Sequence, residues 1–121
     1  MKRLKLKLQL YCGEEIAMGP GKAELLEAIA GTGSISAAAR AMGLSYRRAW
    51  MMVDVMNRCF NEKLVDTTPG GGQKSGAQVS DAGARALAAY RDLQGRVIGA
   101  LPSGGDALEA MLRDEPAPAE A

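Results

Sequence analysis

The stretch SISAAARAMGLSYRRAW, residues 34–50, has the spacing of two helices joined by one tight turn. Ser34 or Ser36 is in position to cap the first helix, because a hydroxyl oxygen can accept a hydrogen bond from a free N–H of the first turn. Gly43 stands where a helix ends in a left-handed residue, a conformation that glycine adopts without steric cost. Ser45 is in position to cap a second helix. The pattern predicts a helix-turn-helix.

The predicted second helix begins with side chains that suit a DNA groove. Its first turn presents Tyr46, Arg47 and Arg48 directly after Ser45. Arg47 or Arg48 can bind guanine O6 and N7 in bidentate fashion, and Ser45 and Tyr46 can contact a phosphate or a base edge. The plainer alternative is an ordinary helical hairpin with a solvated basic turn, since turns with glycine are common.

Composition limits the class of protein. The chain has 121 residues, of which 47% are hydrophobic and 4% aromatic, and its formal net charge is +1. The length indicates one domain, and the scarcity of aromatic residues predicts a core of Leu, Ile, Val, Met and Ala. The first residues alternate Lys with Leu instead of forming a signal peptide, and no stretch approaches the roughly 18 apolar residues of a membrane span. We therefore expect a cytoplasmic protein without membrane contact.

The reactive residue types argue against catalysis and metal binding. The chain has no histidine and only two cysteines, Cys12 and Cys59, which do not have the paired spacing of a zinc site. Cys59 falls in an apolar helical pattern and is expected in the core. Without a histidine or a plausible pair of nucleophile and base, we predict no enzyme activity, no metal site and no cofactor.

The segments around the motif predict further helices and a first strand. Leu4–Leu10 alternate apolar with polar residues, which predicts a half-buried strand. Pro20 begins a helix that ends at residues 31–33. The second motif helix is expected to run to about residue 60, and Trp50 to pack under the hairpin that follows rather than reach the DNA backbone. The core face of this helix is predicted at Ala49, Met52, Val53, Met56 and Phe60.

A β-hairpin is predicted after the motif. Residues 63–68 and 77–80 read as two strands, and the glycine-rich residues 69–76 form the connection. A hairpin directly after a helix-turn-helix is a wing, whose Gln73 and Lys74 are expected to contact phosphate or a minor groove. The complete set of predicted DNA-contacting residues is Ser34, Ser36, Ser45, Tyr46, Arg47, Arg48, Gln73 and Lys74.

A long helix is predicted over residues 81–101. Its apolar residues recur at intervals of three and four, in a seam that a second copy of the chain could cover. The predicted dimer contacts are Ala86, Tyr90, Leu93, Val97 and Leu101. The alternative is packing within the protomer, for example against the strand predicted at Leu4–Leu10. Residues 102–121 are expected to form a short helix and a disordered tail.

This order of elements resembles the N-terminal DNA-binding half of the ModE molybdate-responsive regulators, which are related to the LysR-type winged helices. The resemblance covers about residues 3–95. It is carried by Gly19–Lys22, Leu25–Ile29, Thr32–Gly43, Ser45–Trp50, Leu64–Val65 and Asp81–Tyr90. Together the predicted elements give a mainly α fold with a small β component, namely a winged helix-turn-helix (residues 1–80), a long C-terminal dimerisation helix (81–101), and a short helix with a disordered tail (102–121).

The resemblance implies a dimeric regulator of transcription that binds double-stranded DNA at a palindromic operator. In that family molybdate binds a pair of C-terminal β-barrel domains. Residues after Leu101 show no alternating strands of this kind, so no molybdate site is carried over. The alternative is an interaction module that dimerises with, or competes against, a full-length regulator.

Overall fold

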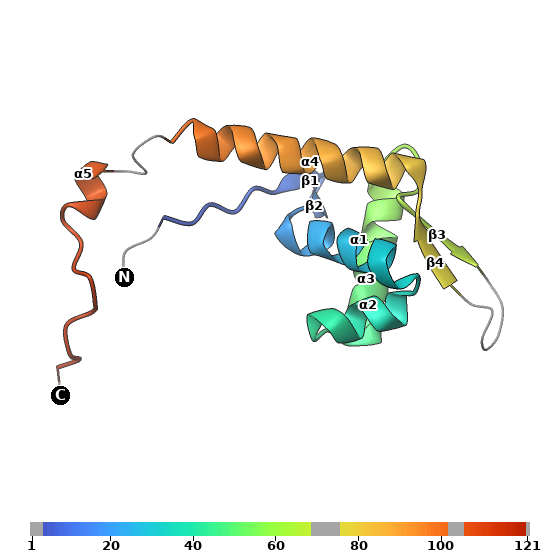
Figure 1. Ribbon diagram of the computed structural model, residues 1–121, viewed down its shortest axis with the longest axis horizontal. Helices are drawn as coiled ribbons and strands as arrows, with labels where there is room; N and C mark the ends of the chain where they lie inside the picture. The colour runs from blue at the N-terminus through green and yellow to red at the C-terminus, as the bar shows by residue number, and fades with distance from the viewer. Residues whose placement is uncertain (1–3, 69–75, 102–105, 121) are drawn as a thin grey trace.

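The computed structural model describes residues 4–68, 76–101 and 106–120. Gln73 and Lys74 therefore lie outside the described residues. Helix α4 runs along one side of the bundle formed by α1, α2 and α3, and the hairpin of β3 and β4 projects from one end (Figure 1). The elements are β1 (Leu10–Cys12), β2 (Glu15–Met18), α1 (Pro20–Thr32), α2 (Ile35–Met42), α3 (Tyr46–Cys59), β3 (Val65–Thr68), β4 (Gly76–Val79), α4 (Asp81–Gly99) and α5 (Asp106–Glu109).

The core is aliphatic, as the composition predicted. Its largest fully buried side chains come from β2, α1, α3 and the start of β3, and they are Met18, Leu25, Leu26, Ile29, Met56, Leu64 and Val65. On α3 the predicted core face is confirmed at Ala49, Val53 and Met56, which are buried, while Met52 and Phe60 pack at its edge. Of the methionines on this helix, Met51 instead faces solvent.

The helix-turn-helix forms at the predicted residues. The Ser34 hydroxyl accepts a hydrogen bond from the Ala37 N–H at 2.9 Å, so Ser34 rather than Ser36 caps α2. Gly43 ends α2 with a φ of 69°, in the left-handed region that favours glycine. Small side chains at Ala38 and Ala49 are fully buried, which lets α2 and α3 cross closely.

The strand predicted over Leu4–Leu10 is wrong in extent. Only Leu10–Cys12 are paired, antiparallel to β2, and Gly13 turns the chain with a φ of 60°. Residues 4–9 form no strand within the described chain, and Leu4 and Leu6 are 48% and 50% exposed. The reason is that β2 has only four residues and cannot pair with the whole alternating segment.

Helix α4 is attached to the rest of the protomer through Tyr90. The ring is 5% exposed, and the phenol hydroxyl donates a hydrogen bond to the Leu8 carbonyl at 2.8 Å. Burial raises the pKa of this phenol. Ala86 also packs against the core. Ala86 and Tyr90 were predicted as dimer contacts, but they pack within the protomer, which was the alternative.

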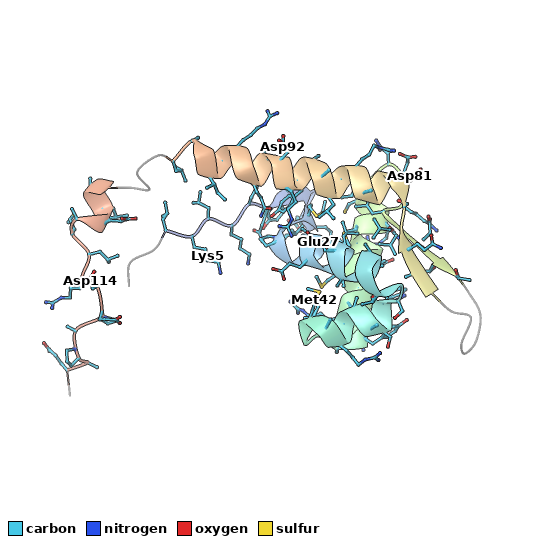
Figure 2. The ribbon with its side chains drawn as sticks, in the orientation of Figure 1. Lys5, Glu27, Met42, Asp81, Asp92 and Asp114 are labelled. Atoms are coloured by element: carbon cyan, nitrogen blue, oxygen red, sulfur yellow. The ribbon has the colours of Figure 1, made fainter. Side chains whose placement is uncertain are left out.

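An ion pair between α1 and α4 adds to this attachment. The Arg91 guanidinium donates to the carboxylate of Glu27, which lies on α1 below α4 in the view of Figure 2. Asp92 lies on the opposite side of α4, away from the bundle (Figure 2). Beyond Tyr90 the predicted seam is not covered by the bundle, because Leu93 and Leu101 are exposed and Val97 is half-buried.

The hairpin β3–β4 confirms the predicted wing. Its strands pair from Val65 opposite Val79 to Thr68 opposite Gly76. The predicted strand ends differ by one or two residues from those observed. Cys59 is half-buried at the end of α3 rather than in the core, and Cys12 is exposed.

The last described segment carries little regular structure. Helix α5 is a short four-residue helix, and residues 110–120 form no helix or strand. Among the described helices, none combines the length and the apolar character that a membrane crossing requires.

Candidate nucleic-acid interface

The first turn of α3 is held in place from two sides. The Ser45 hydroxyl accepts a hydrogen bond from the Arg48 N–H at 3.1 Å and thereby caps the helix. Ala49 is fully buried and fixes which side of α3 faces the core. Because successive residues of an α-helix are about 100° apart, Arg47 lies nearly opposite Ala49, while Arg48 and Trp50 lie on the two flanks.

The exposed face of this turn carries cations without partners among the described residues. Arg47 and Arg48 are exposed, and neither guanidinium makes a hydrogen bond or ion pair within that part of the chain. The other arginines of α2, α3 and α4 all have a partner. These pairs are Arg40 with Ser36, Arg58 with Asp54, Arg85 with Glu62, Arg91 with Glu27, and Arg96 with Asp92. The start of α3 is therefore open to an anionic ligand.

One flank of α3 faces a notch rich in hydroxyl groups, which we call the hydroxyl notch. It lies between the start of α2, the side chains of Tyr46 and Trp50, and the ends of β3 and β4 farthest from the Val65–Val79 pair. Its lining residues are Ser34, Ile35, Ser36, Tyr46, Trp50, Thr67, Thr68, Gly76 and Ala77. The positive end of the α2 dipole and several hydroxyl donors meet here, a combination that suits a phosphate.

The other flank faces a second recess, which we call the cationic groove. It is lined by Lys22, Ser45, Arg47, Arg48, Met51, Met52 and Val55. Lys22 comes from the first turn of α1 and is half-buried, with no hydrogen bond or ion pair to the described residues. Burial lowers the pKa of its ammonium group; Glu15 opposes this shift, and nearby Arg48 acts with it.

The structure therefore gathers most of the predicted residues on one surface. Ser34, Ser36 and Tyr46 line the hydroxyl notch, and Ser45, Arg47 and Arg48 line the cationic groove. Trp50 is 47% exposed and borders the notch together with residues of the wing, so it is not packed under the wing as predicted.

Sequence reasoning did not select three residues of this surface. Thr67 and Thr68 could have been found from their place on a wing strand beside α2, since hydroxyl groups there suit phosphate. Lys22 carries no such signal, because only the packing of α1 against α3 brings it next to Arg48.

Two helices joined by a glycine turn, a wing and exposed arginines at the start of the second helix define the class of winged helix-turn-helix DNA-binding proteins. Residues 21–84 match the family described as "Bacterial regulatory helix-turn-helix protein, lysR family". The chain belongs to this family.

The chain is also similar to named molybdenum-related proteins. It is 40% identical over 98 residues to the molybdenum-pterin-binding protein MopA of Rhodobacter capsulatus, covering 78% of this chain and 37% of that protein. It is 44% identical over 92 residues to the molybdenum transport protein ModE of Azotobacter vinelandii, covering 76% and 34%. It is 36% identical over 87 residues to the DNA-binding transcriptional dual regulator ModE of Escherichia coli strain K12, covering 72% and 32%.

The matched part of the chain thus spans about a third of each of these relatives, at 37%, 34% and 32% of their lengths. The resemblance to ModE regulators is confirmed for the DNA-binding part.

Proposed function

We propose that this protein binds operator DNA as a homodimer, with α3 in the major groove, and regulates transcription at that site. The observation that carries the proposal is the pair Arg47 and Arg48. Both stand without partners among the described residues, on the exposed first turn of α3, whereas Arg58 later on α3 and the arginines of α2 and α4 are paired. A bidentate guanidinium contact with guanine contributes about 1–3 kcal/mol of discrimination against other bases.

The hydroxyl notch supports a backbone contact beside α3. A helix with its side chains is about 10–12 Å across and fills a major groove of about 12 Å, so the flanks of α3 meet the sugar-phosphate backbones. Ser34 and Ser45 already accept a capping hydrogen bond, and their hydroxyl hydrogens are available to a phosphate oxygen. Gln73 and Lys74 of the wing stay proposed contacts to the DNA backbone.

The proposed dimer uses a different surface from the one that faces DNA. Leu4 and Leu6 lie beside Ile98 and Leu101 in a shared recess, and all four are exposed. Residues 4–7 keep the alternating pattern of a strand yet make no backbone hydrogen bond with the described residues. A second copy related by a twofold axis can supply both an apolar cover and an antiparallel strand partner. The proposed contacts become Leu93, Val97 and Ile98 on α4, and Leu101 just after it.

A binding assay tests the DNA-reading role. Operator sequences are first selected from random DNA duplexes with the purified protein. The selection is done with and without molybdate, because the names of the similar proteins refer to molybdenum. Replacing Arg47 and Arg48 together by Ala is expected to abolish specific binding while the circular dichroism spectrum stays unchanged. The matched control is the double replacement of Arg85 and Arg96, whose side chains pair with carboxylates elsewhere. Unchanged operator binding by the first variant would refute the proposal.

Sedimentation of the pure protein separates the homodimer from the alternative interaction module. A monomer that binds DNA only in the presence of a longer relative would favour the module. Since operator DNA is the proposed ligand, the activity is expected in the cytoplasm.

A further inference from the structure

We propose that Lys22 and Arg48 together hold one backbone phosphate of the bound DNA in the cationic groove, which leaves Arg47 as the guanidinium that reads a base. The inference rests on the proposed DNA-binding function and deepens it. It adds a contact from α1 and divides the two neighbouring arginines between two tasks.

The angular positions on α3 separate the tasks of the arginines. Both arginines line the cationic groove, but Arg47 lies about 160° from the buried Ala49, nearly opposite the core, whereas Arg48 lies only about 100° from it. Arg48 shares its flank with Met52 and Val55, which line the cationic groove. A side chain opposite the core reaches the floor of the major groove, and a side chain on the flank meets the backbone beside it.

The surroundings of Lys22 favour an anion in this groove. The ammonium is half-buried and makes no hydrogen bond or ion pair to the described residues, and its charged neighbours are the Glu15 carboxylate and the Arg48 guanidinium, a like charge. A partly desolvated pair of like charges is unfavourable until an anion neutralises it. Burial lowers the pKa of Lys22 and Arg48 adds to this shift, while the Glu15 carboxylate opposes it.

The start of α1 adds to the positive potential. The helix begins at Pro20 after Gly19, with no capping side chain and no acidic residue in its first turn. The positive end of its dipole is therefore not neutralised where Lys22 stands. The groove continues through Ser45, whose hydroxyl hydrogen can be donated to the same phosphate.

The side of α3 on which this groove lies gives it a distinct role. The hydroxyl notch is on the Trp50 flank, and the cationic groove is on the Arg48 flank. A helix in the major groove has one DNA strand on each side, so the two recesses meet phosphates of opposite strands. Two such contacts fix how deeply and at what angle α3 enters the groove.

The test compares single substitutions on the selected operator and on an unrelated duplex. Lys22→Gln and Arg48→Gln are each expected to weaken binding to both duplexes about tenfold, and to lower the slope of log K against log salt by about one. Base preference in a repeated selection stays unchanged. Arg47→Gln is expected to relax base preference at one position instead.

Control variants keep the result interpretable. Lys22→Arg preserves the charge and is expected to restore most of the affinity. Lys63→Gln removes the same charge past the far end of α3, about 20 Å from its first turn, and is expected to leave DNA binding unchanged. Thermal melting of Lys22→Gln checks that the fold is retained.

A neutral methylphosphonate placed at each operator position locates the contact. At one position it is expected to weaken binding of the wild type but not of Lys22→Gln or Arg48→Gln. The inference would be overturned if Lys22→Gln bound DNA as tightly as Lys63→Gln does, or if Arg48→Gln changed the base preference. Either result would leave the proposed function intact. If the wild-type protein selects no DNA sequence, both the proposed function and this inference are refuted.

Discussion

At the scale of single residues, Asn57 joins α3 to the wing. Its side-chain carbonyl accepts hydrogen bonds from the Leu64 and Val65 N–H groups at 2.9 and 3.1 Å, and its amide donates to the Val65 carbonyl at 3.0 Å. The side chain therefore takes the place that a neighbouring strand would occupy beside β3. No local sequence signal predicts this role, because the partners come together only when the chain after α3 turns back.

Replacing Asn57 by Ala is expected to destabilise the protein by about 2–4 kcal/mol, since buried backbone groups at Leu64 and Val65 lose their partners. Urea unfolding followed by circular dichroism measures the change. Asn61 is exposed and makes no hydrogen bond with the described residues, so Asn61→Ala is the control and is expected to stay within about 0.5 kcal/mol of the wild type. Equal stability of the two variants would contradict the assigned role.

At the scale of elements, the sequence predicted best what is decided locally. Ser34, Gly43 and Ser45 mark helix ends through hydrogen bonds and backbone conformation within a few residues, and the structure has each end where they predict it. The arm at residues 4–10 was predicted less well, because alternation shows that a segment suits a strand but not whether a partner exists. The spacing of apolar residues on α4 likewise does not show whether Tyr90 contacts a second copy or its own protomer, where its hydroxyl binds the Leu8 carbonyl. The candidate site also combines local and non-local features. The place of Arg47 follows from the sequence of α3 alone, whereas that of Lys22 depends on how α1 packs against α3.

Helix α4 approaches the start of β3 closely at Gly83. A Cβ atom there would lie 2.2 Å from the Leu64 carbonyl oxygen and 2.7 Å from Val79 Cγ1, so α4 would have to move away from the wing. Gly83→Ala is expected to destabilise the protein by about 1–3 kcal/mol despite the higher helix propensity of Ala. On the same helix, a Cβ atom added at Gly95 would meet nothing within 4 Å among the described residues, so Gly95→Ala is expected to stabilise by up to about 1 kcal/mol. Thermal melting compares the two, and a Gly83→Ala variant that melts with or above the wild type would refute the close approach.

At the scale of the whole molecule, the DNA-facing surface and the proposed dimer surface are built from different elements. The first consists of the start of α3 with its two flanks, and the second of the N-terminal arm and the last turns of α4. The bundle and the Tyr90 hydrogen bond to Leu8 connect them. A twofold axis through the arm and α4 would then fix the distance between the two α3 helices, and with it the spacing of the operator half-sites.

The proposed dimer surface is tested by placing charged side chains at positions that are exposed in the single protomer. Leu6 and Ile98 are 50% and 67% exposed, so Leu6→Glu with Ile98→Glu is expected to leave the fold intact but place carboxylates inside the proposed interface, where burying a charge is costly. Sedimentation equilibrium is expected to give twice the protomer mass for the wild type and the protomer mass for the variant. Met111→Glu alters an 84% exposed apolar residue outside this surface, and this variant is expected to remain a dimer.

The monomeric variant should lose affinity for a complete palindrome while binding an isolated half-site as the wild-type protomer does. A wild type that sediments as a monomer, or a double variant that stays dimeric, would show that the arm and α4 do not form the interface.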